Sequence, residues 1–236
     1  MVSTQVPLAM HMSDGLVNAP TAVGFGLVAA VGLAIAVHRA RADLDDRTAP
    51  MAGLVTAFVF AVQMINFPIL PGASGHLLGG ALVAILVGPW VGSLCIAIVL
   101  AVQALLFADG GLTALGTNIV NMALVGVFAG HLVATALRPL ARRGRAGLLT
   151  TAFVAALVNT VVAALAFVVE YAIGGAGGAT LGTVAALMLG LHVLIGIGEG
   201  IITAATVGAV AAVRPDLLHL LRGAPTTPLE VRGSAA

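Results

Sequence analysis

Long apolar stretches are the feature that most constrains this chain. A helix that crosses a bilayer needs roughly 17 to 25 mostly apolar residues. Candidate stretches lie at about residues 20–38, 51–68, 75–88, 90–107, 116–137, 148–172 and 184–213. Only 8% of the residues are charged, whereas about a quarter are charged in an ordinary soluble domain. The sequence therefore predicts an all-α, polytopic membrane protein with seven transmembrane helices.

The third stretch is short, and a break precedes it between Asn66 and Gly72, where two prolines interrupt the helical pattern. Non-helical backbone at membrane depth is tolerated only against protein or a water-filled cavity. We therefore interpret this break as a candidate cavity wall.

The basic residues predict the orientation, because they concentrate in short cytoplasmic loops. With seven crossings, the regions after the first, fifth and seventh stretches share one side of the membrane. They hold every basic residue of the chain: Arg39, Arg41, Arg47, Arg138, Arg142, Arg143, Arg145, Arg214, Arg222 and Arg232. We expect the amino terminus outside and the carboxyl terminus in the cytoplasm. The expected divisions are an amino-terminal extension (1–9), a transmembrane domain (10–215) and a cytoplasmic tail (216–236).

The chain contains no lysine. A Walker phosphate loop needs a lysine to reach the β and γ phosphates of ATP. Any ATP hydrolysis must therefore come from a partner, and we expect a transport subunit and not an enzyme. The single cysteine, Cys95, lies within an apolar stretch and is interpreted as a packed thiol.

Two histidines lie where apolar stretches begin on the predicted outer side, His11 and His76. A histidine second in a chain offers one ion its terminal amine, its backbone nitrogen and an imidazole nitrogen. A second histidine completes four nitrogens in a plane, a geometry that favours Ni²⁺ or Cu²⁺ and is open to low-spin Co²⁺. His11 qualifies if the mature chain begins at Met10, so we predict that translation starts there or that residues 1–9 are removed. The alternative is that each histidine only makes a hydrogen bond or a headgroup contact.

Several motifs resemble the substrate-binding S component of cobalt and nickel energy-coupling factor (ECF) transporters, the CbiM/NikM family. The resemblance covers about residues 10 to 215 and rests on blocks in the same order. These blocks are Met10-His11-Met12-Ser13-Asp14-Gly15-Leu16, Asn66-Phe67-Pro68, Gly72-Ala73-Ser74-Gly75-His76-Leu77-Leu78-Gly79-Gly80, Gly88-Pro89-Trp90, residues 109–123 and residues 192–200.

This resemblance implies that Met10, His11 and His76 bind the transported Co²⁺ or Ni²⁺ in the plasma membrane of a prokaryote. It also implies a transmembrane T component and two ABC ATPases as partners, with a small accessory membrane subunit as a further candidate. Cobalt supply for cobalamin synthesis is one role that the family suggests. No resident cofactor and no nucleic-acid partner are expected, and the sequence does not separate cobalt from nickel.

Other polar residues are candidates for orienting the site, because outer contacts fix the tautomers of metal-binding histidines. These candidates are Ser74, Asn66 and Asn118. Glu199 is the one acid well inside an apolar stretch, and we interpret it either as part of the transport path or as a helix contact.

Two other function classes stay open from the residues alone. A stand-alone secondary metal transporter would place coupling sites in broken helices near the midplane, and Glu199 is the only acid available for one. An intramembrane metalloenzyme is disfavoured, because the chain has no His-Glu-x-x-His motif.

Overall fold

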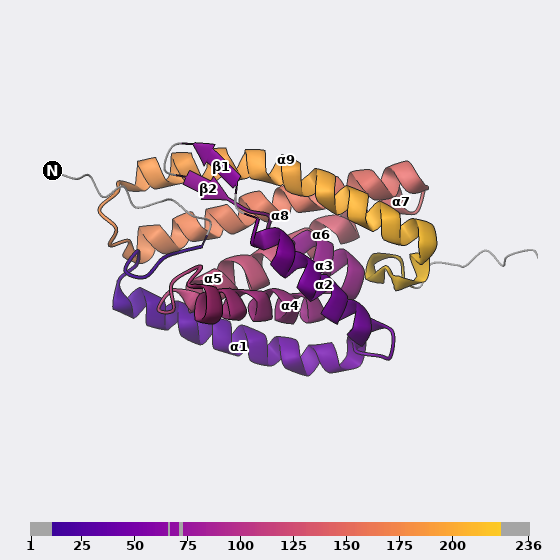
Figure 1. Cartoon of the computed structure of the whole chain (residues 1–236), viewed down its shortest axis with the longest axis horizontal. Coiled ribbons are helices and arrows are strands. Elements are labelled where there is room, and N and C mark those ends of the chain that lie inside the picture. The colour runs from indigo at the N-terminus through magenta and orange to yellow at the C-terminus, as the bar shows by residue number, and fades with distance from the viewer. Residues whose placement is uncertain (1–10, 66, 71–72, 223–236) are drawn as a thin grey trace, which may run out of the picture.

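The computed structural model describes residues 11–65, 67–70 and 73–222, with the backbone alone for 67–70 and 73–75. It is a bundle of helices with one short hairpin near the amino-terminal end (Figure 1). Within the described residues, five helical segments are long and apolar enough to cross a membrane. They are Ala19–Asp43, Pro89–Phe107, Leu115–Ala136, Arg145–Gly174 and Leu181–Val213.

Three of these segments are single helices, α1 (Ala19–Asp43), α8 (Arg145–Gly174) and α9 (Leu181–Val213). The second is α4 (Pro89–Val102) continued by a π-helix, η1 (Gln103–Phe107). The third is α5 (Leu115–Asn118), a π-helix η2 (Ile119–Gly126) and α6 (Val127–Ala136). Shorter elements are α2 (Thr48–Gln63), α3 (Gly80–Val87), α7 (Arg138–Ala141) and the 3₁₀ turns η3 (Pro215–Leu217) and η4 (His219–Leu221).

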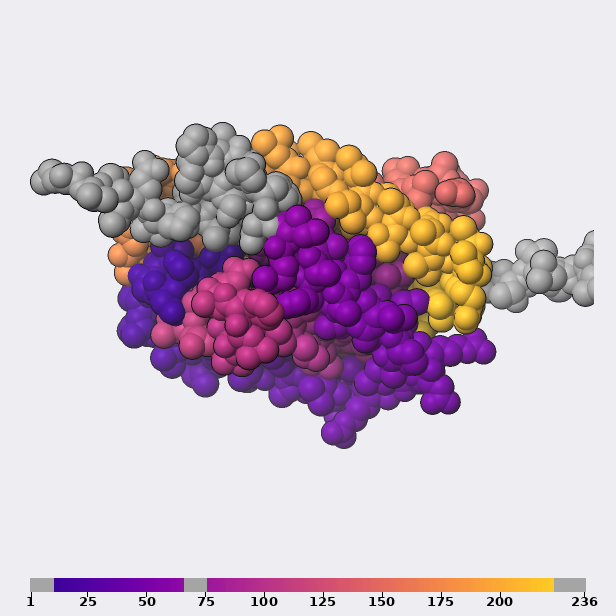
Figure 2. Space-filling model, viewed as in Figure 1, coloured from indigo at the N-terminus to yellow at the C-terminus, as the bar shows by residue number. Residues whose placement is uncertain are grey.

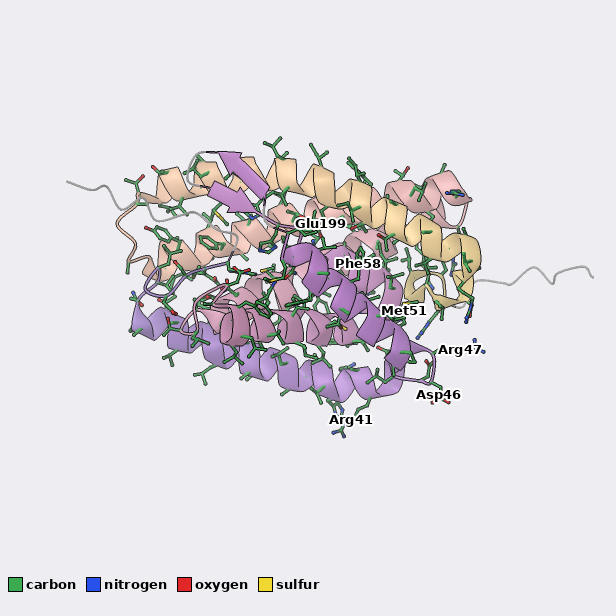
Figure 3. All side chains as sticks on the ribbon, viewed as in Figure 1. Arg41, Asp46, Arg47, Met51, Phe58 and Glu199 are labelled. Carbon is green, nitrogen blue, oxygen red and sulfur yellow. The ribbon has the colours of Figure 1, made fainter. Side chains whose placement is uncertain are left out.

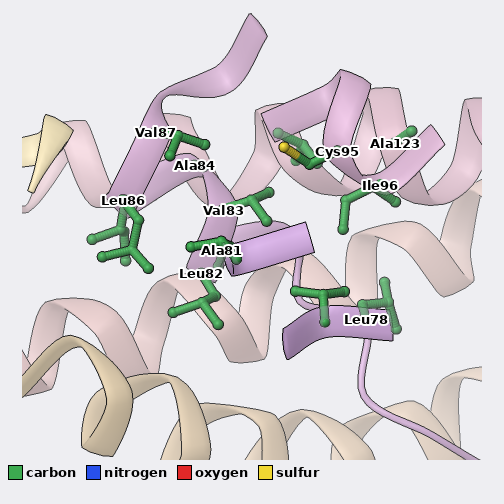
Figure 4. Close-up of a cluster of buried hydrophobic side chains, with 14 of the residues drawn as sticks. Leu78, Ala81, Leu82, Val83, Ala84, Leu86, Val87, Cys95, Ile96 and Ala123 are labelled. Atoms are coloured by element: carbon green, nitrogen blue, oxygen red, sulfur yellow. The ribbon is translucent and has the colours of Figure 1, made fainter. Parts of the chain in front are cut away.

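The core of the bundle is built around α3, whose residues are all buried. Figure 4 shows Ala81, Leu82 and Val83 of this helix among apolar side chains of its neighbours. Small residues permit the close packing: a Cβ on Gly130 of α6 would lie 2.9 Å from Ala81. Outward-facing apolar side chains such as Leu27, Leu132 and Leu194 are 60% exposed or more, as expected of surfaces that face lipid.

The predicted break forms an antiparallel hairpin of β1 (Phe67–Leu70) and β2 (Ala73–Gly75). The second apolar stretch was expected to run to residue 68, but α2 ends at Gln63. Pro68 disfavours helical backbone at the residue before it, so it keeps the helix from reaching residue 68 but does not set its end at Gln63. The short third stretch contributes only α3, after an extended segment at residues 76–79.

The two ends of the bundle differ in charge. The loop after α1, which carries Arg47, and α7 lie at the end of the bundle opposite the start of α1 (Figures 1 and 3). Residues 216–222 of the expected tail pack at this end, where Leu218 is fully buried and Arg222 donates to Thr48 Oγ1 at 2.6 Å. The arrangement agrees with the arginine pattern. The number of crossings and the orientation in the membrane stay predictions.

Candidate metal site

His11 and His76, which are distant in the sequence, meet in the structure. His76 directly follows β2, and the centroids of the two imidazole rings lie 4.6 Å apart with the ring planes inclined by 47°. Both histidines are buried, with exposed fractions of 4% and 2%. The predicted pair is therefore close enough for a single ion to contact both rings.

The hydrogen bonds of the two rings leave the same nitrogen free. His11 Nδ1 donates to Asp109 Oδ1 at 3.0 Å, and His76 Nδ1 donates to the Leu77 carbonyl at 2.9 Å. Since a neutral imidazole carries one N–H, both Nε2 atoms hold a lone pair. Both Nε2 atoms are buried and have no hydrogen-bond partner in the described part of the chain. Metal-binding histidines commonly donate their other N–H to a carboxylate or carbonyl, so this pair has the arrangement of a cation site.

Asp109, in the loop between η1 and α5, is a site residue that the sequence did not single out. The hydrogen bond from His11 is the main cause that lowers the pKa of Asp109, so the carboxylate stays charged beside the ring. The block that begins at Asp109 carried part of the family resemblance, and an acid beside two glycines was the available signal. Its partner could not be read from the sequence, because the two residues lie 98 positions apart.

Asn118, a predicted orienting residue, holds the backbone next to His11. Its Oδ1 accepts from Met12 N at 2.8 Å, and its Nδ2 donates to the Met12 carbonyl at 3.1 Å. Gly111 N donates to the same carbonyl at 3.0 Å. These contacts attach the segment around His11 to α5 and to the loop before it, which also carries Asp109.

A second contact attaches the same segment two residues further along the chain, at Asp14. Asp14 Oδ1 accepts from Thr113 N at 2.8 Å and from Thr113 Oγ1 at 2.5 Å. These hydrogen bonds lower the pKa of Asp14. A side chain on Gly111 would collide with the Asp14 backbone nitrogen. In Figure 2 the amino-terminal residues (indigo) lie directly against a magenta segment, in agreement with these contacts.

Glu199 of α9 holds the segment that follows His76. Its carboxylate accepts hydrogen bonds from the backbone nitrogens of Leu78 at 2.7 Å and Gly79 at 3.1 Å. Asn159 and Thr160 of α8 donate to the same carboxylate at 2.9 and 3.0 Å. Figure 3 shows Glu199 inside the bundle, close to α2. These four hydrogen bonds agree with the interpretation of Glu199 as a helix contact. Two of them also hold the backbone that follows His76.

Three predicted residues lie outside the description: Met10 and Asn66 are among the undescribed residues, and the side chain of Ser74 is not described. The described residues contain no group of three or more His, Cys, Asp or Glu side chains around one ion position. Two imidazoles alone do not fill a four-nitrogen plane, so the remaining ligands would be backbone or terminal nitrogens or groups outside the described residues. The chelate of a second-position histidine closes its six-membered ring through Nδ1, the atom that Asp109 holds here.

Asp109→Ala is expected to weaken Ni²⁺ binding by about 10- to 100-fold, because loss of an outer partner of a metal-binding histidine has that typical cost. The measurement is competition with a chelating dye on the purified chain. Asp109→Asn is the matched control, because its amide oxygen still accepts from His11 and should recover part of the affinity. Equal affinity in Asp109→Ala and the unchanged chain would show that Asp109 does not support the ligand.

Comparison with known proteins identifies the family of this chain. The family described as "Cobalt uptake substrate-specific transmembrane region" (CbiM) matches residues 11–217. A NikMN nickel transport relative from Archaeoglobus fulgidus is 39% identical over 210 residues, which are 89% of this chain and 68% of that protein. The cobalt transport protein CbiM of Sorangium cellulosum is 32% identical over 220 residues, 90% of this chain and 96% of that one.

A crystal structure of a truncated transition metal transporter has the same fold. It superposes with a TM-score of 0.78 at 27% identity and covers 86% of this chain and 98% of that structure. The family match spans both histidines and nearly all of the bundle, and the apolar helices are those of a multi-pass membrane protein. This chain therefore belongs to the CbiM/NikM family of cobalt and nickel transport proteins.

Proposed function

We propose that this protein is the metal-binding transmembrane subunit of an ECF-type ABC importer, which captures Co²⁺ or Ni²⁺ outside the cell and delivers it to the cytoplasm. The observation that carries the proposal is the buried pair of His11 and His76, whose Nε2 atoms are both without a hydrogen-bond partner in the described residues. Imidazole nitrogen suits both ions. The relatives' names, which mention nickel in one case and cobalt in another, support both as candidates.

The source of energy in this proposal is a pair of partner ATPases coupled through a transmembrane T component. The chain has no lysine with which to build a Walker phosphate loop. A small accessory membrane subunit is a further proposed partner, and cobalt supply for cobalamin synthesis is a proposed role.

The alternative is transport by this chain alone. That mechanism needs polar or acidic coupling sites within the membrane. Glu199 was the candidate for this role, but its carboxylate already accepts four hydrogen bonds. Glu199 is thus held by neighbouring groups and is not available as a coupling site.

Cells that express this chain with its T component and ATPases are expected to accumulate radioactive Ni²⁺ or Co²⁺, and cells that express the chain alone are not. The reason is that the chain lacks a lysine for ATP hydrolysis and has no free acid at Glu199 for ion coupling. The matched control is an ATPase whose Walker lysine is replaced, in the presence of all other subunits. Full uptake by the chain alone would contradict the proposal and favour a secondary transporter.

A further inference from the structure

A small cavity lies next to Leu78, in the segment that follows His76. Its volume is about 10 Å³, which is about the space that one water molecule or one ion occupies. The polar and sulfur-containing residues in its wall are Asn121 and Met122 of η2 and Met188 and His192 of α9. All four are buried. Leu78 closes one side, and apolar residues of α8 line the rest.

Like the two outer histidines, His192 makes its hydrogen bond through Nδ1. Its Nδ1 donates to the Met188 carbonyl at 2.6 Å. Nε2 is therefore the nitrogen that carries the lone pair in the neutral ring. A histidine within a helix often makes this contact for structural reasons alone. The other residues of the cavity wall must therefore show whether His192 is packed or acts as a ligand.

Asn121 and Glu170 supply that distinction. Asn121 Nδ2 donates to Glu170 Oε2 at 2.7 Å. The remaining oxygens, Asn121 Oδ1 and Glu170 Oε1, are buried and have no hydrogen-bond partner among the described residues. Buried polar atoms are nearly always paired, so these two oxygens are acceptors available to a cation or a hydrogen-bond donor.

Glu170 is a second buried acid, which the sequence interpretation did not include. The sequence interpretation gives Glu199 as the one acid well inside an apolar stretch. Glu170 of α8 is equally buried, with an exposed fraction of 1%. In the described part of the chain no basic side chain forms an ion pair with it. Burying a carboxylate without a partner is costly, and ionisable groups inside membrane proteins commonly mark ion paths.

The cavity adjoins the outer site through the backbone. Leu78, which forms part of its wall, is two residues after His76, and its backbone nitrogen donates to Glu199. Met188, His192 and Glu199 are spaced four and seven residues apart on α9, so they share one face of that helix. On the opposite wall, Asn121 and Met122 belong to the π-helix η2, a distortion that is frequent at functional sites.

We propose that this cavity is a second, inner cation site that takes the divalent transition-metal ion after it leaves the outer histidine pair. His192 Nε2 and Asn121 Oδ1 are the ligands, the thioethers of Met122 and Met188 form a polarisable wall, and Glu170 supplies negative charge behind Asn121. The inner site binds more weakly than the outer one, since it offers one imidazole and neutral oxygen and sulfur atoms. The inference rests on the proposed function, because the outer pair is what loads the inner site.

The test is a Ni²⁺ titration of the purified full chain in detergent, with bound metal counted by mass spectrometry after gel filtration. The unchanged chain is expected to bind a tight ion and then a weaker one. His192→Asn is expected to lose the weaker ion and keep the tight one, because the asparagine amide replaces Nδ1 and its bond to Met188 but removes Nε2. Glu170→Gln, which keeps an oxygen for Asn121 but removes the charge, should weaken only the second ion. His38→Asn, at an exposed position, is the matched control.

The experiment separates evidence against the outer site from evidence against the inner site. His76→Asn should lose the tight ion and keep the weaker one, and X-ray absorption of the remaining Ni²⁺ should show nitrogen or oxygen neighbours with sulfur nearby. If the unchanged chain binds a single ion at every Ni²⁺ concentration, the cavity holds water only and the inference is overturned. The same holds if His192→Asn and Glu170→Gln leave the second ion unchanged. If His76→Asn keeps the tight ion, the outer site of the proposed function fails instead.

Discussion

His76→Asn is expected to reduce the affinity of the full chain for Ni²⁺ and Co²⁺ by at least about 100-fold, since removal of an outer partner alone costs 10- to 100-fold. The asparagine amide takes the position of Nδ1 and retains the donation to the Leu77 carbonyl. Only Nε2, the buried atom without a partner in the described residues, is removed. Competition with a chelating dye at fixed pH measures the change.

The control for this variant is His38→Asn, which makes the same chemical change at an exposed position of α1. Both variants should elute and unfold like the unchanged protein, because neither removes a hydrogen bond that the structure contains. If His76→Asn binds metal as tightly as His38→Asn does, His76 is not a ligand and the proposed site is wrong.

A chain that begins at Met10 is expected to bind Ni²⁺ far more tightly, by about 100-fold or more, than one that keeps residues 1–9. The resemblance assigns one ligand to the terminal amine of Met10, and in the longer chain that nitrogen is an amide, a much poorer donor. Losing a ligand should cost at least as much as losing an outer partner, which costs 10- to 100-fold. The two lengths are compared by the same dye competition, after intact mass spectrometry has identified each amino terminus.

The control for chain length is His76→Asn in both chains, which should remove most of the difference between them, because the amine completes the site only together with His76. Equal, tight binding by a chain shown to begin at Met1 would rule out the amine as a ligand. The site would then consist of side chains, with His11 and His76 binding through Nε2. That result would also agree with the hydrogen bond that His11 Nδ1 donates to Asp109.

Much of the fold could be predicted because the apolar stretches act locally. Each predicted stretch contains a helix, and the break before His76 is the observed hairpin. The main difference is at the end of α2, which stops at Gln63 and not at residue 68. The outer histidines could also be chosen, because a histidine next to Met10 and one among glycines are unusual at a membrane surface.

The supporting residues were harder to predict. Glu199 was noticed as an acid in an apolar helix, but its backbone partner Leu78 lies 121 positions away. Asp109 belongs to a block that carries the family resemblance, but that block does not indicate its role. Glu170 lies near the end of its apolar stretch, where an acid is less conspicuous. In each case the residue type was visible, and the partner that gives it a role was not.

The sequence by itself determined that this chain enters a membrane, because the transfer of apolar segments into lipid depends on composition and local order. It also predicted which two histidines to compare. Only the tertiary structure decided that His11 and His76 meet, that Asp109 and Glu199 hold their surroundings, and that Asn121 and His192 line a second cavity. Hydrogen bonds between distant segments depend on how the helices pack. That packing follows from the shapes of many side chains at once, and no local pattern encodes it.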